Sequence, residues 1–135
     1  MIVVDSSLVM TWYLEDEVTP ATERIFDQVT RDGAVVPSLW RLEIANAFRT
    51  AIRKNRMTSR YRDESLADLQ LLDIVVRDDT HERAWTEILA LSDRHGLTPY
   101  DASYLELALR ERLPLASLDK ALLAAARAEG LETLP

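Results

Sequence analysis

Short runs of apolar residues alternate along the chain with longer stretches in which apolar residues recur every three to four positions. The short runs lie at 2–4, 34–36, 74–76 and 115–118, and they predict strands. The longer stretches predict helices over 20–31, 39–54, 59–72, 80–95, 99–111 and 120–129. Residues 131–134 are a candidate edge strand at the end of the chain.

Cap and turn residues support several of these boundaries. Thr19-Pro20 and Thr98-Pro99 both place a favoured N-cap residue before a proline at the first helical position. Gly96 stands where a left-handed residue would end the preceding helix. In the helix over 39–54 we expect one stripe to face the core, formed by Leu42, Ala45, Phe48 and Ile52.

The alternation of strands and helices predicts the fold class. Strands of three to five apolar residues separated by helices favour a parallel sheet that is covered on both faces. We therefore predict an α/β protein, a three-layer α-β-α sandwich with a short, doubly wound parallel sheet, as one domain over 1–135. In such sheets ligands bind beyond the carboxyl ends of the strands, which is where candidate chemistry is sought.

Composition and charge exclude several functions. The 135 residues carry a net charge of −7, which argues against general coating of nucleic acid. The absence of cysteine excludes disulfides and thiolate zinc sites and fits a cytoplasmic protein. No apolar run reaches the length of a membrane span, and no glycine-rich phosphate loop is present. His81 and His95 lack metal-ligand spacing, and we expect both to be solvated helix residues.

Four acids adjoin apolar structure, unlike the other acids of the chain. Asp5 and Asp119 end the first and fourth predicted strands, although each could simply cap the following helix. Asp101 lies on an inward stripe near a helix start, but Thr98–Asp101 also matches a capping box. Glu43 borders a buried helix stripe, which is weak evidence by itself.

Together the four acids indicate a metal site more strongly than any one of them does. Carboxylates about 4 Å apart repel by about 4 kcal/mol at an effective dielectric near 20, so a shared pocket needs protons or a cation. Oxygen ligands select Mg²⁺ or Mn²⁺, and such an ion suits phosphoryl chemistry.

Four segments carry a resemblance to a known family. They are Val4-Asp5-Ser6-Ser7, the run from Pro37 to Asn46, the run from Leu97 to Tyr104, and Leu115 to Asp119. In this order and spacing, over essentially the whole chain, they resemble the PIN-domain ribonucleases, and in particular the VapC-type toxins of type II toxin–antitoxin pairs. Members of this family commonly have threonine two residues before the last acid, and this chain has Ser117 at that position.

The resemblance implies an Mg²⁺- or Mn²⁺-dependent endoribonuclease whose catalytic acids are Asp5, Glu43, Asp101 and Asp119. Asp5 and Asp101 would be the firmest metal ligands and Asp119 a further one, with Glu43 acting directly or through water. Ser7 and Ser117 would bind the carboxylates or the phosphate. Asn46 would stand behind the ligands, although a structural amide is the favoured interpretation. The expected products carry a 3′-hydroxyl and a 5′-phosphate.

The resemblance also implies partners. These are an RNA substrate, a VapB-like antitoxin whose basic or aromatic tail enters the acidic groove, and a second copy in a homodimer. The window 49–62 holds six basic residues and no acid, so it carries +6 and the rest of the chain −13. Its first cations, Arg49, Arg53, Lys54 and Arg56, are candidate RNA contacts, with a solvated helix end as an equal alternative.

Two other functions remain as alternatives. A receiver-like signalling domain would need an acid pair after the first strand, where this chain has Ser6-Ser7 after Asp5. A catalytically silent PIN-like module would bind RNA or protein without cleaving it. A cleavage assay paired with a metal titration separates the silent module from an enzyme.

Overall fold

The computed structural model describes all of residues 1–135. The strands are β1 (Ile2–Val4), β2 (Ala34–Pro37), β3 (Ile74–Arg77), β4 (Leu115–Ala116) and β5 (Thr133–Leu134). The helices are α1 (Ser6–Thr11), α2 (Pro20–Asp32), α3 (Trp40–Arg53), α4 (Ser59–Leu69), α5 (Thr80–Arg83), α6 (Leu89–His95), α7 (Pro99–Glu111) and α8 (Lys120–Ala128). A 3₁₀ turn, η1 (Glu15–Glu17), and a π-helical turn, η2 (Ala84–Ile88), complete the structure.

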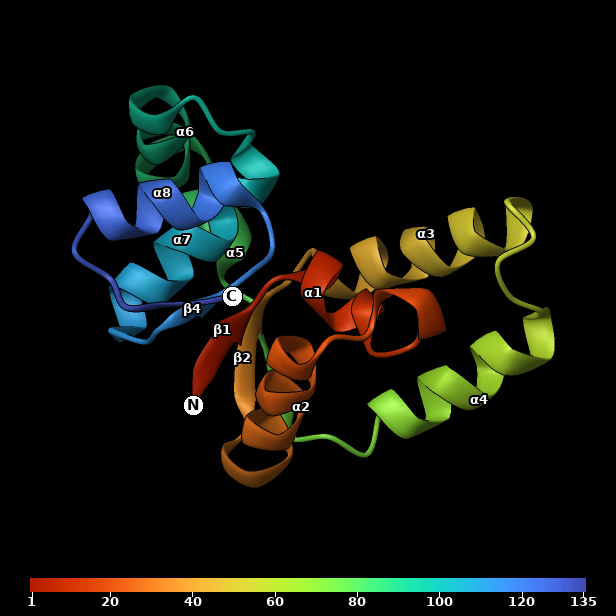
Figure 1. The fold of residues 1–135 in the computed structure, drawn as a ribbon. Helices are drawn as coiled ribbons and strands as arrows, with labels where there is room; N and C mark the ends of the chain where they lie inside the picture. The colour runs from red at the N-terminus through yellow and green to blue at the C-terminus, as the bar shows by residue number, and fades with distance from the viewer.

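The five strands form one parallel sheet in the order β3-β2-β1-β4-β5. Helices α1–α4 lie on one side of the strands and α5–α8 on the other (Figure 1). This arrangement confirms the predicted three-layer, doubly wound α/β fold. None of the helices combines the length and apolar character that a membrane span requires.

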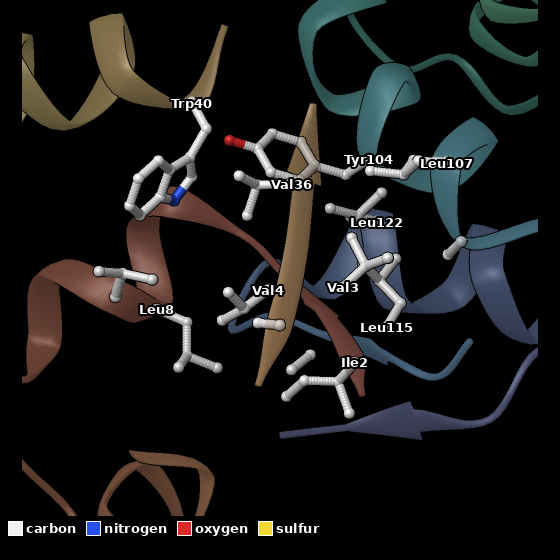
Figure 2. Packing of buried hydrophobic residues seen from close by; sticks show 14 of the residues in the cluster. Ile2, Val3, Val4, Leu8, Val36, Trp40, Tyr104, Leu107, Leu115 and Leu122 are labelled. Carbon is white, nitrogen blue, oxygen red and sulfur yellow. The ribbon is translucent and has the colours of Figure 1, made fainter. Parts of the chain in front are cut away.

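The central strand and the helix α7 build the core. Ile2, Val3 and Val4 of β1 are fully buried, as are the side chains of β4. Every residue of α7 from Ala102 to Ala108 is buried, because this helix is covered by the sheet, by α6 and by α8. Figure 2 shows Leu107 and Leu122 packing toward Val3 and Leu115.

Cap chemistry explains where the two proline-led helices begin. Thr19 accepts the backbone N–H of Thr22 at 3.2 Å, and the Thr22 hydroxyl accepts the Thr19 N–H at 2.9 Å. Thr98 accepts the backbone N–H of Asp101 at 3.1 Å. Gly96 has the left-handed conformation expected of it, with φ 66°.

The predicted core stripe of α3 was wrong in phase. Leu42 is 77% exposed and Ala45 is exposed, whereas Phe48 is fully buried as predicted. The stripe that packs inward is formed by Trp40, Ile44, Phe48 and Ala51. Its members lie three or four residues apart, so they share one face of the helix. Leu42 and Ala45 lie on the opposite face.

Several boundaries and one predicted environment also differ from the sequence predictions. The strand expected over 115–118 ends at Ala116, the one over 131–134 spans only Thr133–Leu134, and α4 stops at Leu69. The helix expected over 80–95 is interrupted by the π turn η2. His95 is not solvated: its side chain is 13% exposed, and Nε2 lies 2.6 Å from a Glu129 carboxylate oxygen.

Candidate active site

The strand order reverses between β1 and β4, and the candidate acids gather there. The chain runs outward from β1 through β2 to β3, then returns to the other side of β1 as β4. Asp5 follows β1 directly, while Ser117 and Asp119 follow β4. A crevice at such a reversal, at the carboxyl ends of the strands, is the usual ligand site of a doubly wound sheet.

Asp5 is the most buried of the four acids, at 5% exposure. Its Oδ2 atom accepts hydrogen bonds from the hydroxyls of Ser7 at 2.7 Å and Ser117 at 2.9 Å. Asp5 occupies the N-cap position of α1, but its side chain makes no capping hydrogen bond. The capping alternative therefore fails for Asp5, and the predicted contacts of Ser7 and Ser117 with a carboxylate are present.

Glu43, in the first turn of α3, is held by hydroxyl groups that the sequence analysis did not single out. The Tyr104 hydroxyl donates to Oε1 of Glu43 at 2.5 Å, and the Ser6 hydroxyl donates to the same oxygen at 3.3 Å. Ser6 also lies 3.5 Å from Oδ1 of Asp5, so it stands between the two carboxylates. No hydroxyl or N–H group donates to Oε2 of Glu43.

Asp101 and Asp119 differ in how far capping occupies them. Asp119 caps α8 through Oδ1, which accepts the Leu122 N–H at 2.9 Å. The alternative that Asp119 caps the following helix therefore holds for one of its two oxygens. The Asp101 carboxylate makes no bond back to the Thr98 N–H, so only half of the expected capping box forms. The Thr98 side chain still acts on the half-buried Asp101 carboxyl group, because its hydrogen bond opposes the rise in the pKa of that group.

The carboxylates influence one another through space. Burial, together with the charges of Asp5 and Asp101, raises the pKa of Glu43, and the hydrogen bonds from Tyr104 and Ser6 oppose this rise. Burial and the charges of Asp5 and Asp119 raise the pKa of Asp101. The ionised Asp5 carboxylate thus makes both Glu43 and Asp101 harder to ionise, which places these acids in one electrostatic site.

The donor chemistry of this site fits a hard divalent cation. Hydroxyl or amide groups occupy Oδ2 of Asp5, Oε1 of Glu43 and Oδ1 of Asp119. The second oxygen of each carboxylate has no donor, apart from the long 3.5 Å contact of the Ser6 hydroxyl with Oδ1 of Asp5. All-oxygen donors suit Mg²⁺ or Mn²⁺, and a cation would relieve the mutual repulsion. As the side chains stand, no three Asp, Glu or His residues are close enough to hold one ion.

The other predicted contacts differ in their surroundings. Asn46 is exposed on α3, and no hydrogen bond of its side chain is present, so its role stays a prediction. Arg49, Arg53 and Lys54 are exposed and have no ion-pair partner. Arg56 is not free, because it binds Asp16 at 3.0 Å and Glu17 at 2.6 Å.

A groove connects the acidic site with part of this basic window. It has a volume of about 290 Å³, and its lining includes Ser7, Thr50, Lys54 and Arg56 as well as the acid Glu17. Ser7 donates to the Asp5 carboxylate, so one end of the groove adjoins the acids.

The comparisons with known proteins agree with this fold. A model of the PIN domain family matches residues 2–128. The crystal structure of PAE2754 from Pyrobaculum aerophilum is similar with a TM-score of 0.66 and 22% identity, over 98% of this chain and 87% of that chain. FitAcB from Neisseria gonorrhoeae is similar with a TM-score of 0.69 and 13% identity, over 100% and 97% of the two chains. A search of curated proteins gives no match. The chain belongs to the PIN domain family, whose members are generally nucleases that use divalent metal ions.

Proposed function

We propose that this protein is an Mg²⁺- or Mn²⁺-dependent endoribonuclease that acts as the toxin of a toxin–antitoxin pair. The observation that carries the proposal is the environment of Asp5. A carboxylate at 5% exposure, held by two serine hydroxyls at the reversal of strand order, is coupled to the charges of Glu43 and Asp101. Such a cluster is costly for a purely structural element and useful for binding a cation.

The proposed mechanism assigns a role to each acid. A divalent ion held by these acids would offset charge on the phosphodiester and activate water, and in-line hydrolysis would leave a 3′-hydroxyl and a 5′-phosphate. Asp5 and Asp101 are the assigned ligands, and Asp119 adds its uncapped oxygen. Glu43 contributes Oε2 directly or through water. Ser7 and Ser117 fix Asp5 in place through its Oδ2 atom.

The RNA follows the cationic side of α3 in this proposal. Arg49, Arg53 and Lys54 are the assigned phosphate contacts, because they are exposed, unpaired and close in sequence to the groove that begins at Ser7. Asn46 is exposed between Glu43 and these cations, and we assign it to the substrate. We do not assign Arg56 to the RNA, because it already forms ion pairs with Asp16 and Glu17.

The proposal includes protein partners. An apolar groove of about 330 Å³ between α3, α4 and β3 supports an antitoxin, since its lining includes Trp40, Ile44, Leu66 and Leu69. The basic or aromatic tail of such an antitoxin would then reach the acids. A homodimer is proposed from the family resemblance.

Cleavage of total cellular RNA tests the proposed activity. We compare the wild type with Asp5→Asn, in Mg²⁺, Mn²⁺ or EDTA, using protein freed of any co-purifying partner. Asp27→Asn is the matched control, because Asp27 is exposed and makes no ion pair. We expect metal-dependent cleavage that Asp5→Asn reduces by about 100-fold or more and Asp27→Asn leaves unchanged.

The fragment ends and the melting temperature extend this test. A 2′,3′-cyclic phosphate among the products would contradict the proposed hydrolysis. No cleavage and no rise in melting temperature with metal would leave the catalytically silent binding module. A rise in melting temperature without cleavage would mean that the metal site is formed but that the substrate is missing from the pool.

A further inference from the structure

Tyr104 is a fully buried tyrosine whose hydroxyl reaches the acidic site. It lies on α7, where every residue from Ala102 to Ala108 is buried, and its side chain is 0% exposed. The hydroxyl donates to Oε1 of Glu43 at 2.5 Å, although the two residues are 61 positions apart in the sequence. In Figure 2 the Tyr104 ring extends from α7 toward the start of α3, where Trp40 lies, with its oxygen leading.

Both donors that reach Glu43 meet the same oxygen. Tyr104 and Ser6 donate to Oε1, at 2.5 Å and 3.3 Å, and Oε2 receives no hydrogen bond. The hydrogen bonds therefore tie down one oxygen of the carboxylate and leave the other available. Asp5 shows the same division, because its two short hydrogen bonds both fall on Oδ2.

We propose that Tyr104 is a positioning residue that fixes the Glu43 carboxylate so that Oε2 takes part in holding the divalent ion. This inference rests on the proposed function of the site. A glutamate side chain has three rotatable bonds, and each conformer that points away from the ion lowers the affinity of the site. Partners that orient metal ligands in this way commonly change metal affinity or activity by about 10- to 100-fold when they are removed.

A merely structural tyrosine makes a different prediction. A buried tyrosine hydroxyl needs a hydrogen-bond partner, and Glu43 would supply one without any role in metal binding. In that case loss of the hydroxyl changes the melting temperature but not the affinity for metal. The two roles therefore separate when metal binding and stability are measured on the same samples.

The test is a thermodynamic cycle for Mn²⁺ binding, measured by isothermal titration calorimetry. The cycle compares the wild type, Tyr104→Phe, Glu43→Gln and the double variant. Tyr13→Phe is the matched control, because Tyr13 is also buried, at 8% exposure, but packs against Phe48. Thermal melting without metal verifies that each variant is folded, and steady-state cleavage with excess RNA gives kcat and KM.

We expect Tyr104→Phe to raise the Kd for Mn²⁺ by about 10- to 100-fold and to lower kcat with little change in KM. In the Glu43→Gln background the same change should alter the Kd by no more than about twofold, because the oriented carboxylate is already gone. Tyr13→Phe should bind Mn²⁺ like the wild type. If Tyr104→Phe does not fold, Ser6→Ala removes the second donor to Oε1 and should weaken binding in the same direction.

Three results would overturn the inference. Wild-type affinity in Tyr104→Phe would show that the hydroxyl does not act on the metal site. Equal losses in the wild-type and Glu43→Gln backgrounds would show that Tyr104 does not act through Glu43. Absence of Mn²⁺ binding by the wild type itself would remove the proposed function together with this inference, whereas the first two results leave the proposed function intact.

Discussion

Two carboxylates of the site are held in the same asymmetric way by hydroxyl groups. Ser7 and Ser117 donate to one oxygen of Asp5, and Tyr104 and Ser6 donate to one oxygen of Glu43. Hydroxyl donors to an ionised carboxylate partly offset the cost of burying its charge. They also leave Oε2 of Glu43 without a donor and Oδ1 of Asp5 with only the long 3.5 Å contact of the Ser6 hydroxyl. This division is what an orienting shell around a metal site requires.

The pH dependence of stability tests the repulsion at Asp101. Burial and the charges of Asp5 and Asp119 raise its pKa, so the folded protein binds this proton more tightly than the unfolded chain does. The ionised carboxylate therefore lowers the free energy of unfolding above the raised pKa. This penalty disappears as the pH falls below the ordinary value of 3.8.

Asp101→Asn should consequently be more stable than the wild type at neutral pH in EDTA. We expect a gain on the order of 1 kcal/mol or less, because the carboxylate is only half buried, and no gain near pH 3. Urea unfolding across this pH range measures the difference. Asp27→Asn serves as the control. If the difference in the free energy of unfolding between the wild type and Asp101→Asn were the same at every pH, the predicted repulsion would be contradicted.

Single residues also show what the sequence could reveal of the site. The four acids were predictable, because strand ends and helix starts meet at one edge of a parallel sheet. Ser6 and Tyr104 were not, because the contact of Tyr104 with Glu43 spans 61 positions and leaves no local spacing signal. The one available signal was the hydroxyl-bearing Tyr104 within the largely apolar stretch of α7 from Ala102 to Ala108.

At the scale of elements, α3 serves three purposes on different faces. Trp40, Ile44 and Phe48 pack into the core, and Glu43 enters the acidic site from the first turn. The exposed face carries Arg49 and Arg53, which lie one helical turn apart and have no ion-pair partner. One helix thus fixes the distance between the acidic site and the proposed phosphate contacts.

The salt dependence of RNA binding tests this exposed face of α3. The double variant Arg49→Gln, Arg53→Gln should bind RNA more weakly whatever its sequence. It should also reduce the slope of log Kd against log salt by about 1.4, since each lost contact to single-stranded RNA removes about 0.7. Fluorescence anisotropy in EDTA, where cleavage is blocked, measures both effects.

The matched control for this test is Arg60→Gln. Arg60 belongs to the same basic window, but it is paired with Glu64 on α4. We expect its removal to leave the salt slope unchanged. An equal loss of slope in Arg60→Gln and in the double variant would mean that general charge, rather than the α3 face, attracts the RNA.

The elements themselves were predictable to different degrees. The β-branched runs in β1, β2 and β3 identified strands, because such residues suit a sheet that is buried on both faces. The phase of α3 was misjudged because Leu42, Ile44 and Ala45 are closely spaced apolar residues that fit two stripes. Only the tertiary packing, in which α3 contacts α1 and Ile44 joins the core, selects Ile44 over Leu42. The π turn η2 could not be predicted either, because a pattern of apolar residues every 3.6 positions indicates only a regular α-helix.

At the scale of the whole molecule, the topology creates the site. The sheet order β3-β2-β1-β4-β5 brings the ends of β1 and β4 together, so Asp5 and Ser117 meet although they are 112 positions apart. Helices α3 and α7 then bring Glu43 and Asp101 to the same edge. Although the net charge is −7, the helix that bears Glu43 also carries the unpaired Arg49 and Arg53, which are the phosphate contacts of the proposed function.

The most direct test of the central claim is the position of a divalent ion in the protein. Crystals grown with Mn²⁺ give an anomalous difference map in which the ion is identified by its own scattering. We predict a peak bound by Asp5 and Asp101, with ligand distances of about 2.0–2.2 Å, and next to Oε2 of Glu43. A clear map without a peak among these carboxylates, from protein that cleaves RNA in the presence of Mn²⁺, would contradict the account.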